Sequence, residues 1–200
     1  MRSAKVNRKF SWLCLFLPLV LQLGCGKIPE DTVGDAAALT SDRAYVDTDW
    51  GFQVFIPDNS IWGYSSQTSY KARASNGLPL VQVSILRVPF EGSTYRPRMT
   101  LEPRVFPRNA TLESYAAFVE QDYKARFMGY RPEQKRVFKV SGKDAIEWTF
   151  RSVLIRSVGD RFVSTLVVDE QKVYVFLGTG QFSSFPLQDY RSIASSMEFL

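Results

Sequence analysis

The pattern of hydrophobic and polar residues divides the chain into three parts. Residues 12–23 form an apolar run that only Pro18 and Gln22 interrupt. Residues 26–44 are mostly polar and contain few large apolar side chains. From Tyr45 onward, short apolar stretches alternate with turn residues, which is typical of a folded domain rich in strands. We therefore divide the chain into residues 1–24, 25–44 and 45–200.

Alternation of apolar and polar residues predicts several β-strands in the third part. Phe52, Val54 and Ile56 alternate with period two, and Gly51 supplies the turn that joins them to residues 45–47. An Asn-Gly turn, a strong hairpin signal, joins the next two strands. The C-terminal half reads as a meander of strands rich in Val, Phe, Tyr and Ile. The further strands are expected over residues 66–75, 80–88, 136–140, 145–157, 161–168 and 173–178.

Two segments carry the helical period and predict the α+β class. Residues 111–128 place apolar side chains on one stripe, with Thr111 as the cap and Gly129 after the end. Residues 184–196 form the second helix, which Ser184 caps, and a short strand closes the chain. The two stripes are Leu112, Tyr115, Ala116, Val119, Tyr123 and Phe127, and then Leu187, Tyr190, Ile193, Ala194 and Met197.

The first part has the features of a secretory signal. Its first ten residues contain four basic residues and no acid, and the apolar run is shorter than the ~20 residues of a membrane-spanning helix. The end of the run, Leu21-Gln22-Leu23-Gly24-Cys25, resembles the lipobox of bacterial lipoproteins. The resemblance implies cleavage between Gly24 and Cys25 and a diacylglyceryl group on the Cys25 thiol. Two alternatives remain: an ordinary secretory signal with an incidental cysteine, or acylation at Cys14.

Acylation at Cys25 would hold the protein at a membrane. Two chains such as palmitate anchor a protein stably, whereas one chain binds only marginally. Gly26 follows the cysteine, where an Asp would favour retention at the inner membrane of enteric-type bacteria. The lipobox resemblance therefore implies a place in the bacterial cell envelope, with the periplasmic face of the outer membrane favoured. Residues 26–44 would serve as a flexible tether.

Composition excludes several classes of function. The chain has 25 basic and 20 acidic residues, but four of the basic ones lie in the signal, which leaves a net charge of +1. Such a balance argues against nucleic-acid binding. The chain contains no histidine, which removes Ser-His-Asp and Cys-His catalysis and histidine metal sites. We expect no cofactor, no metal and no enzymatic activity.

A segment rich in proline and arginine interrupts the strand pattern. Residues 89–110 contain four prolines and four arginines, and we interpret them as one long loop, a type of segment that is often functional. Guanidinium groups suit acidic partners or lipid headgroups because they present several donors in one plane. The alternative is a solvated insertion in which Glu91 and Glu102 are local counter-charges. The candidate partner-binding residues are Arg96, Arg98, Arg104 and Arg108.

The domain resembles the PsbP-like family over most of residues 45–200, most clearly at its two ends. The hairpin Tyr45-Val46-Asp47 to Ile56-Pro57, with Trp50-Gly51-Phe52 between, is similar to the family's opening hairpin. The end, Tyr190-Arg191-Ser192-Ile193-Ala194 to Phe199, resembles its terminal helix and strand. The family includes the extrinsic photosystem II subunit, the yeast Ran-binding import factor and many bacterial lipoproteins. The resemblance implies an α/β/α sandwich around a mainly antiparallel sheet, and adaptor or assembly roles without a shared catalytic set.

Three hypotheses about function follow. The first is a lipid-anchored, non-enzymatic interaction or assembly module that contacts the membrane through acyl chains on Cys25 and binds an envelope protein. The second is a small-molecule or lipid-binding protein with an apolar pocket beside the sheet. The third is a hydrolase with two carboxyl groups in a cleft. Its candidates, Asp144, Glu147, Asp160 and Asp169, are more simply interpreted as exposed charges at turns and on strands.

Overall fold

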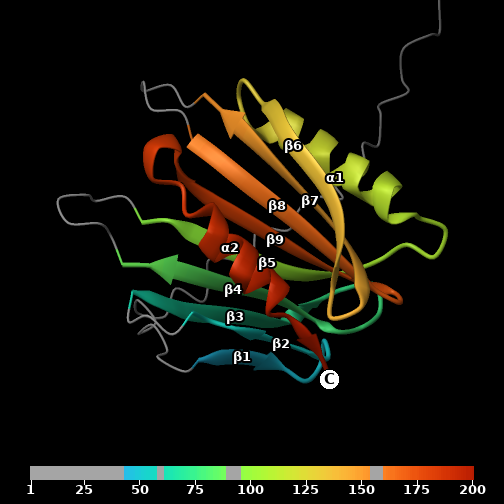
Figure 1. Ribbon diagram of the computed structural model, residues 1–200. Helices are drawn as coiled ribbons and strands as arrows, with labels where there is room; N and C mark the ends of the chain where they lie inside the picture. Colours follow the sequence, from blue (N-terminus) through green and yellow to red (C-terminus); the bar gives the residue numbers. More distant parts are fainter. Residues whose placement is uncertain (1–42, 58–60, 89–95, 154–159) are drawn as a thin grey trace, which may run out of the picture. The chain divides into compact units, whose positions relative to one another are not determined.

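The computed structural model describes residues 43–57, 61–88, 96–153 and 160–200 (Figure 1). These residues belong to one compact unit within Gly34–Leu200. The signal segment, Cys25 and the tether lie outside the described residues. No helix in the described part of the chain has the length and apolar character needed to cross a membrane.

A seven-stranded antiparallel sheet forms the frame of the domain. Its strand order is β3-β4-β5-β9-β8-β7-β6, so β3 and β6 are the outer strands. A smaller antiparallel sheet has the order β1-β2-β10. The strands are β1 Ala44–Asp47, β2 Phe52–Phe55, β3 Trp62–Arg73, β4 Pro79–Arg87, β5 Arg98–Val105, β6 Arg131–Val140, β7 Lys143–Ser152, β8 Asp160–Asp169, β9 Lys172–Gln181 and β10 Glu198–Phe199.

One α-helix lies on each face of the large sheet (Figure 1). Helix α1, Leu112–Arg126, packs on β7 and β8, whereas α2, Leu187–Ser195, lies on the other face with contacts to β8 and β2. A short 3-10 helix, Phe182–Ser184, precedes α2. The expected α+β class with a mainly antiparallel sheet is therefore confirmed.

The alternating side chains of the central strands fill two separate cores. On β8, Phe162 and Leu166 join the core beneath α1, and Val163 and Val167 join the core beneath α2 and the small sheet. Both predicted helical stripes are confirmed, because their residues are buried or half-buried in these two cores. A strand with apolar residues on both faces is the pattern expected for the middle of a sheet that is covered twice.

Two glycines on β9, which have no side chain, allow α2 to lie close to the sheet. A Cβ on Gly178 would lie 2.7 Å from the ring of Tyr190, and one on Gly180 would lie 2.8 Å from the ring of Phe185. The Tyr190 hydroxyl donates a hydrogen bond to the Thr179 carbonyl oxygen at 2.6 Å. The two glycines therefore set the distance and the rotation of α2 on the sheet.

The structure corrects two predictions. Residues 89–110 are not one long loop, because Arg98–Val105 is strand β5 in the large sheet. Strand β4 pairs with β5 only along Arg98–Leu101, so Pro103 lies where β5 is paired on one side, a position that tolerates proline. Helix α2 begins after Pro186 with no side-chain cap, so the expected cap at Ser184 is wrong. By contrast, Thr111 caps α1 as expected.

Candidate functional site

A buried carboxylate between two arginines is the most unusual polar feature of the α2 face. The Glu147 side chain is only 2% exposed. Arg136 binds it with two parallel hydrogen bonds of 2.9 Å, from Nε to Oε1 and from one terminal nitrogen to Oε2. Arg191 adds two bonds to Oε1, at 3.0 and 2.8 Å. We call these three residues the Glu147 cluster.

Three elements bring the Glu147 cluster together. Glu147 lies on β7 with Ile146 and Trp148 turned toward α1, so its own side chain points to the α2 face. Arg136 is the cross-strand partner of Glu147 on β6, and cross-strand partners share a face. Arg191 comes from α2, next to the tyrosine that packs on Gly178. The rotation of α2 therefore determines whether Arg191 reaches the carboxylate.

The cluster borders an open pocket of about 210 Å³. One buried carboxylate meets two guanidinium groups, so the cluster itself carries a net charge of +1. These bonds leave Nη1 of both arginines without a partner among the described residues. Charged N–H donors at an open pocket suit an oxyanion, above all a carboxylate. The pocket is lined by Gln134, Lys135, Arg136, Glu147 and Arg191.

A second cluster of the same composition lies further along β7. Arg151 and Arg161 are cross-strand partners on β7 and β8, and both bind Glu133 at the bulge of β6. Burial alone would raise the pKa of Glu133, but its bonds to the two arginines hold that pKa below the ordinary value. We call Glu133, Arg151 and Arg161 the Glu133 cluster.

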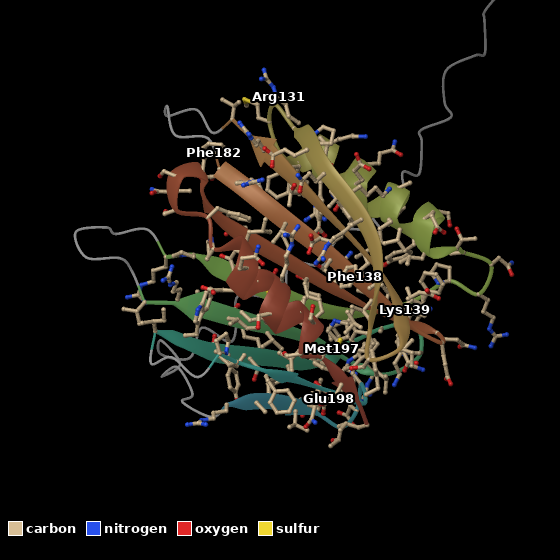
Figure 2. The ribbon with its side chains drawn as sticks, in the orientation of Figure 1. Arg131, Phe138, Lys139, Phe182, Met197 and Glu198 are labelled. Atoms are coloured by element: carbon tan, nitrogen blue, oxygen red, sulfur yellow. The ribbon has the colours of Figure 1, made fainter. Side chains whose placement is uncertain are left out.

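An aromatic ring lies against one arginine of each cluster. The Arg136 guanidinium is 4.3 Å from the centroid of the Phe138 ring, and that of Arg151 is 4.1 Å from the centroid of the Phe182 ring. Figure 2 labels both rings, Phe138 on β6 and Phe182 ahead of α2. Such stacking restricts the plane of a guanidinium without using its N–H donors.

Thr149 lies between the two clusters with its hydroxyl unpaired. It is fully buried on β7, two residues from Glu147 and two from Arg151, so it shares their face of the sheet. Its cross-strand partner on β6 is Gln134, a pocket residue. Within the part of the chain that the structure describes, the Thr149 hydroxyl has no hydrogen-bond partner. We call the two clusters together with Thr149 the arginine face.

The arginines that the sequence singled out do not gather at one site. Arg98 and Arg104 alternate on β5 with the core residues Met99 and Leu101, so they point to the α1 side, away from the arginine face. Arg98 donates to the Ser84 hydroxyl at 2.8 Å, and Arg104 pairs with Glu102 at 2.7 Å. Arg96 and Arg108 are exposed, one before and one after the strand.

Glu102 forms a small network with the arginine beside it. Burial raises its pKa, but Arg104 and a 2.7 Å hydrogen bond from Gln82 lower that pKa below its ordinary value. The partner-binding role of Arg96, Arg98, Arg104 and Arg108 stays a prediction.

The four carboxylates considered for hydrolysis have different surroundings. Asp144 pairs with Lys139 and Asp169 with Lys143, both at the ends of strands. Partial burial raises the pKa of Asp160. The interpretation of Glu147 as an exposed charge is wrong, because Glu147 is buried and bonded to two arginines. Among the described residues, no group of His, Cys, Asp and Glu is placed to hold a metal ion.

Comparisons with known proteins support the architecture. No protein-family model and no curated protein matches the chain. The solved structure of cyanobacterial PsbP (CyanoP) from Synechocystis sp. PCC 6803 has a TM-score of 0.57 at 13% identity, over 83% of this chain and 96% of that chain. The Ran-binding protein Mog1p of Saccharomyces cerevisiae has a TM-score of 0.51 at 7% identity, over 81% of this chain and 96% of that chain. At these identities the likeness shows the fold alone.

Proposed function

Since the chain has the PsbP-like fold that its sequence resemblance implied, we propose that it is a lipid-anchored, non-enzymatic interaction module of a bacterial cell envelope. The observation that carries this proposal is the Glu147 cluster. It holds spare charged donors beside an open pocket, on rigid elements of the sheet and of α2. That arrangement is suited to binding an anionic group of a partner.

The acids of the site are poor candidates for acid–base catalysis. Glu147 accepts four charge-assisted bonds, and Glu133 is held ionised by two arginines. A general base needs a lone pair free for the substrate's proton and a pKa near the working pH. Four guanidinium bonds engage the Glu147 carboxylate, and the pKa of Glu133 is lowered further from neutral pH. The sequence also lacks histidine. These features favour a binding role over a hydrolytic one.

If the chain were instead a small-molecule or lipid-binding protein, we would expect an apolar pocket. The pocket beside α2 is lined by arginine, lysine, glutamine and glutamate, so its chemistry favours a charged group over an acyl chain. The two apolar cores are packed with aromatic side chains, for example Phe150 stacked on Phe162 with ring centroids 4.8 Å apart. The interaction module is therefore the better-supported proposal.

The proposal of a lipid anchor is based on the sequence around Cys25 and can be tested directly. Cys25→Ala is expected to remove the mass of the acyl groups, and the Cys25→Ala chain that lacks residues 1–24 is expected to leave the membrane fraction. Cys14→Ala is the matched control and is expected to change neither. Acyl mass on the Cys25 variant, measured by intact mass, or membrane retention of its chain without residues 1–24, measured by fractionation, would refute the lipid anchor.

The interaction role is tested by photo-crosslinking in the producing cell. A probe at Gln134, an exposed residue of the pocket, is expected to give a discrete protein adduct. Gln121, exposed on α1 at the opposite face, is the control position and is expected to give none. An adduct from a probe at Arg96 but not at Gln134 would move the contact surface to the β5 side. Absence of adducts from both positions would contradict a protein-binding module.

A further inference from the structure

We infer that the arginine face binds an extended acidic segment of a protein partner, with two carboxylates four residues apart, one at each cluster. The inference rests on the proposed function, because it assigns the partner's chemistry. It is carried by the spacing of the clusters, by their charge and by the donors that they leave unused.

The spacing comes from strand β7 itself. Glu147 and Arg151 lie four residues apart on the same face of β7, which separates them by about 13 Å at the rise of a β-strand. An extended peptide has the same rise and the same period of two. Its residues i and i+4 therefore point to one face at a matching distance, whereas residues i and i+3 point to opposite faces.

The charge of the arginine face matches two carboxylates. Four guanidinium groups and the carboxylates of Glu133 and Glu147 leave a net charge of +2. The arginine side chains remain accessible, with exposed fractions of 42% for Arg136 and 50% for Arg151. Arg191 and Arg161 are 22% and 25% exposed. Complementary charge of this kind specifies a partner and its register.

The donors are held in place before any partner arrives. The acids of the two clusters use the Nε atoms of all four arginines, and the Phe138 and Phe182 rings restrict the planes of Arg136 and Arg151. Arg136 and Arg191 keep Nη1 for a ligand at the pocket. Preorganised donors reduce the entropy lost on binding. The buried acids also make the face less basic than a phosphate-binding surface, which favours an acidic peptide.

The test measures peptide binding to the full chain, purified in a non-ionic detergent, by fluorescence anisotropy at low ionic strength. The probe is the labelled peptide Ser-Glu-Thr-Val-Thr-Glu-Ser with both ends blocked, whose glutamates are four residues apart. One control peptide carries Gln in place of both Glu, and another, Ser-Glu-Thr-Val-Glu-Thr-Ser, has its glutamates three residues apart. The first peptide is expected to bind at least about tenfold more tightly than either control, as the loss of a charged contact implies.

Variants locate the binding on the arginine face. Arg136→Gln and Arg151→Gln are each expected to weaken binding of the probe peptide about tenfold, while each acid keeps its second arginine. Lys139→Gln removes one charge from β6 at an exposed ion pair with Asp144, next to but outside both clusters, and is expected to leave the affinity unchanged. Circular dichroism checks that each variant is folded.

Four outcomes would overturn the inference. Equal binding of the peptides with the two glutamate spacings would show that net charge alone determines the affinity. A loss of affinity in Lys139→Gln equal to that in Arg136→Gln would show the same. No binding of any peptide would rule out an acidic segment as the ligand. The crosslinking at Gln134 and the membrane release of the Cys25 variant without residues 1–24 test the proposed function independently of that result. Tighter binding after Asp31→Asn and Asp35→Asn would make the chain's own tether the occupant in place of a partner.

Discussion

The two clusters of the arginine face have the same composition but differ in burial. Glu147 is 2% exposed and accepts four bonds, whereas Glu133 is 15% exposed and lies at a strand bulge. Glu147 is joined to α2 through Arg191, but all three members of the Glu133 cluster belong to the large sheet. Two clusters of the same composition therefore serve different purposes. The Glu147 cluster attaches a helix to the sheet, and the Glu133 cluster organises an accessible surface.

The largest expected effect comes from removing both arginines of one cluster. Arg136→Gln with Arg191→Gln leaves a buried carboxylate without a counter-charge, which is expected to destabilise the fold by about 3–5 kcal/mol. Arg151→Gln with Arg161→Gln leaves the more accessible Glu133 and is expected to cost only about 1–2 kcal/mol. Urea unfolding gives both values, and equal losses would contradict the difference between the clusters.

A smaller effect is expected when α2 is displaced without touching any charge. Gly178→Ala places a methyl group against the Tyr190 ring, which is expected to cost about 1–3 kcal/mol and to shift the neighbouring Arg191. The adjacent Thr179→Ala should cost less than about 0.5 kcal/mol. The Glu133 cluster should be unaffected, so peptide affinity should fall less than in Arg136→Gln. An unchanged unfolding free energy for Gly178→Ala would contradict the proposed role of the glycine.

The lowered pKa of Glu133 predicts that the stability of the fold depends on pH. The pKa of Glu133 is below its ordinary value of 4.5, so its contribution is present above pH 4.5 and is lost as pH falls through the lower folded-state pKa. Glu133→Gln should therefore cost about 1 kcal/mol at neutral pH and less in acid. Thermal melting of both proteins across this range checks it. A difference in melting temperature between the two proteins that grows as the pH falls would contradict this prediction.

The smallest effect is expected at the residue between the clusters. Thr149→Val keeps the shape of the side chain but removes a buried hydroxyl that has no partner, so it should stabilise the fold by up to about 1 kcal/mol. Ser164→Ala is a useful contrast, because the Ser164 hydroxyl donates to the Phe176 carbonyl oxygen at 3.2 Å and its loss should destabilise. A destabilised Thr149→Val would indicate that water or another group satisfies the hydroxyl.

The sequence predicted the elements that carry their own local signal. The stripe of α1 and its cap at Thr111 are contained in the seventeen consecutive residues from Thr111 to Phe127, and the apolar stripe of α2 is equally local. The sequence did not predict strand β5, because Pro103 and the arginines of this segment outweighed the alternation of Met99 and Leu101 with polar neighbours. Pro103 argues against a central strand, and only the one-sided pairing of β5 at that point explains why proline is tolerated there.

The site could not be predicted in the same way, because its members come from distant parts of the chain. Arg136 and Arg191 reach Glu147 only after β6, β7 and α2 are in place. One signal was present: Glu147 interrupts the apolar run from Ala145 to Phe150, where a charge on a strand covered on both faces must find a partner. Of its two partners, Arg136 is the cross-strand neighbour on β6, whereas Arg191 depends on the rotation of α2 and hence on a glycine on β9.

The outer strand β6 has a consequence for proteins held side by side on a membrane. Its backbone forms the edge of the large sheet, where a second copy could otherwise add a strand and begin a chain of copies. That edge carries Arg131, Pro132, Lys135 and Lys139, so an approaching copy meets like charges and a missing N–H group. The composition of β6 would thus keep the molecules separate even at the high local concentration that the proposed lipid anchor would produce on a membrane.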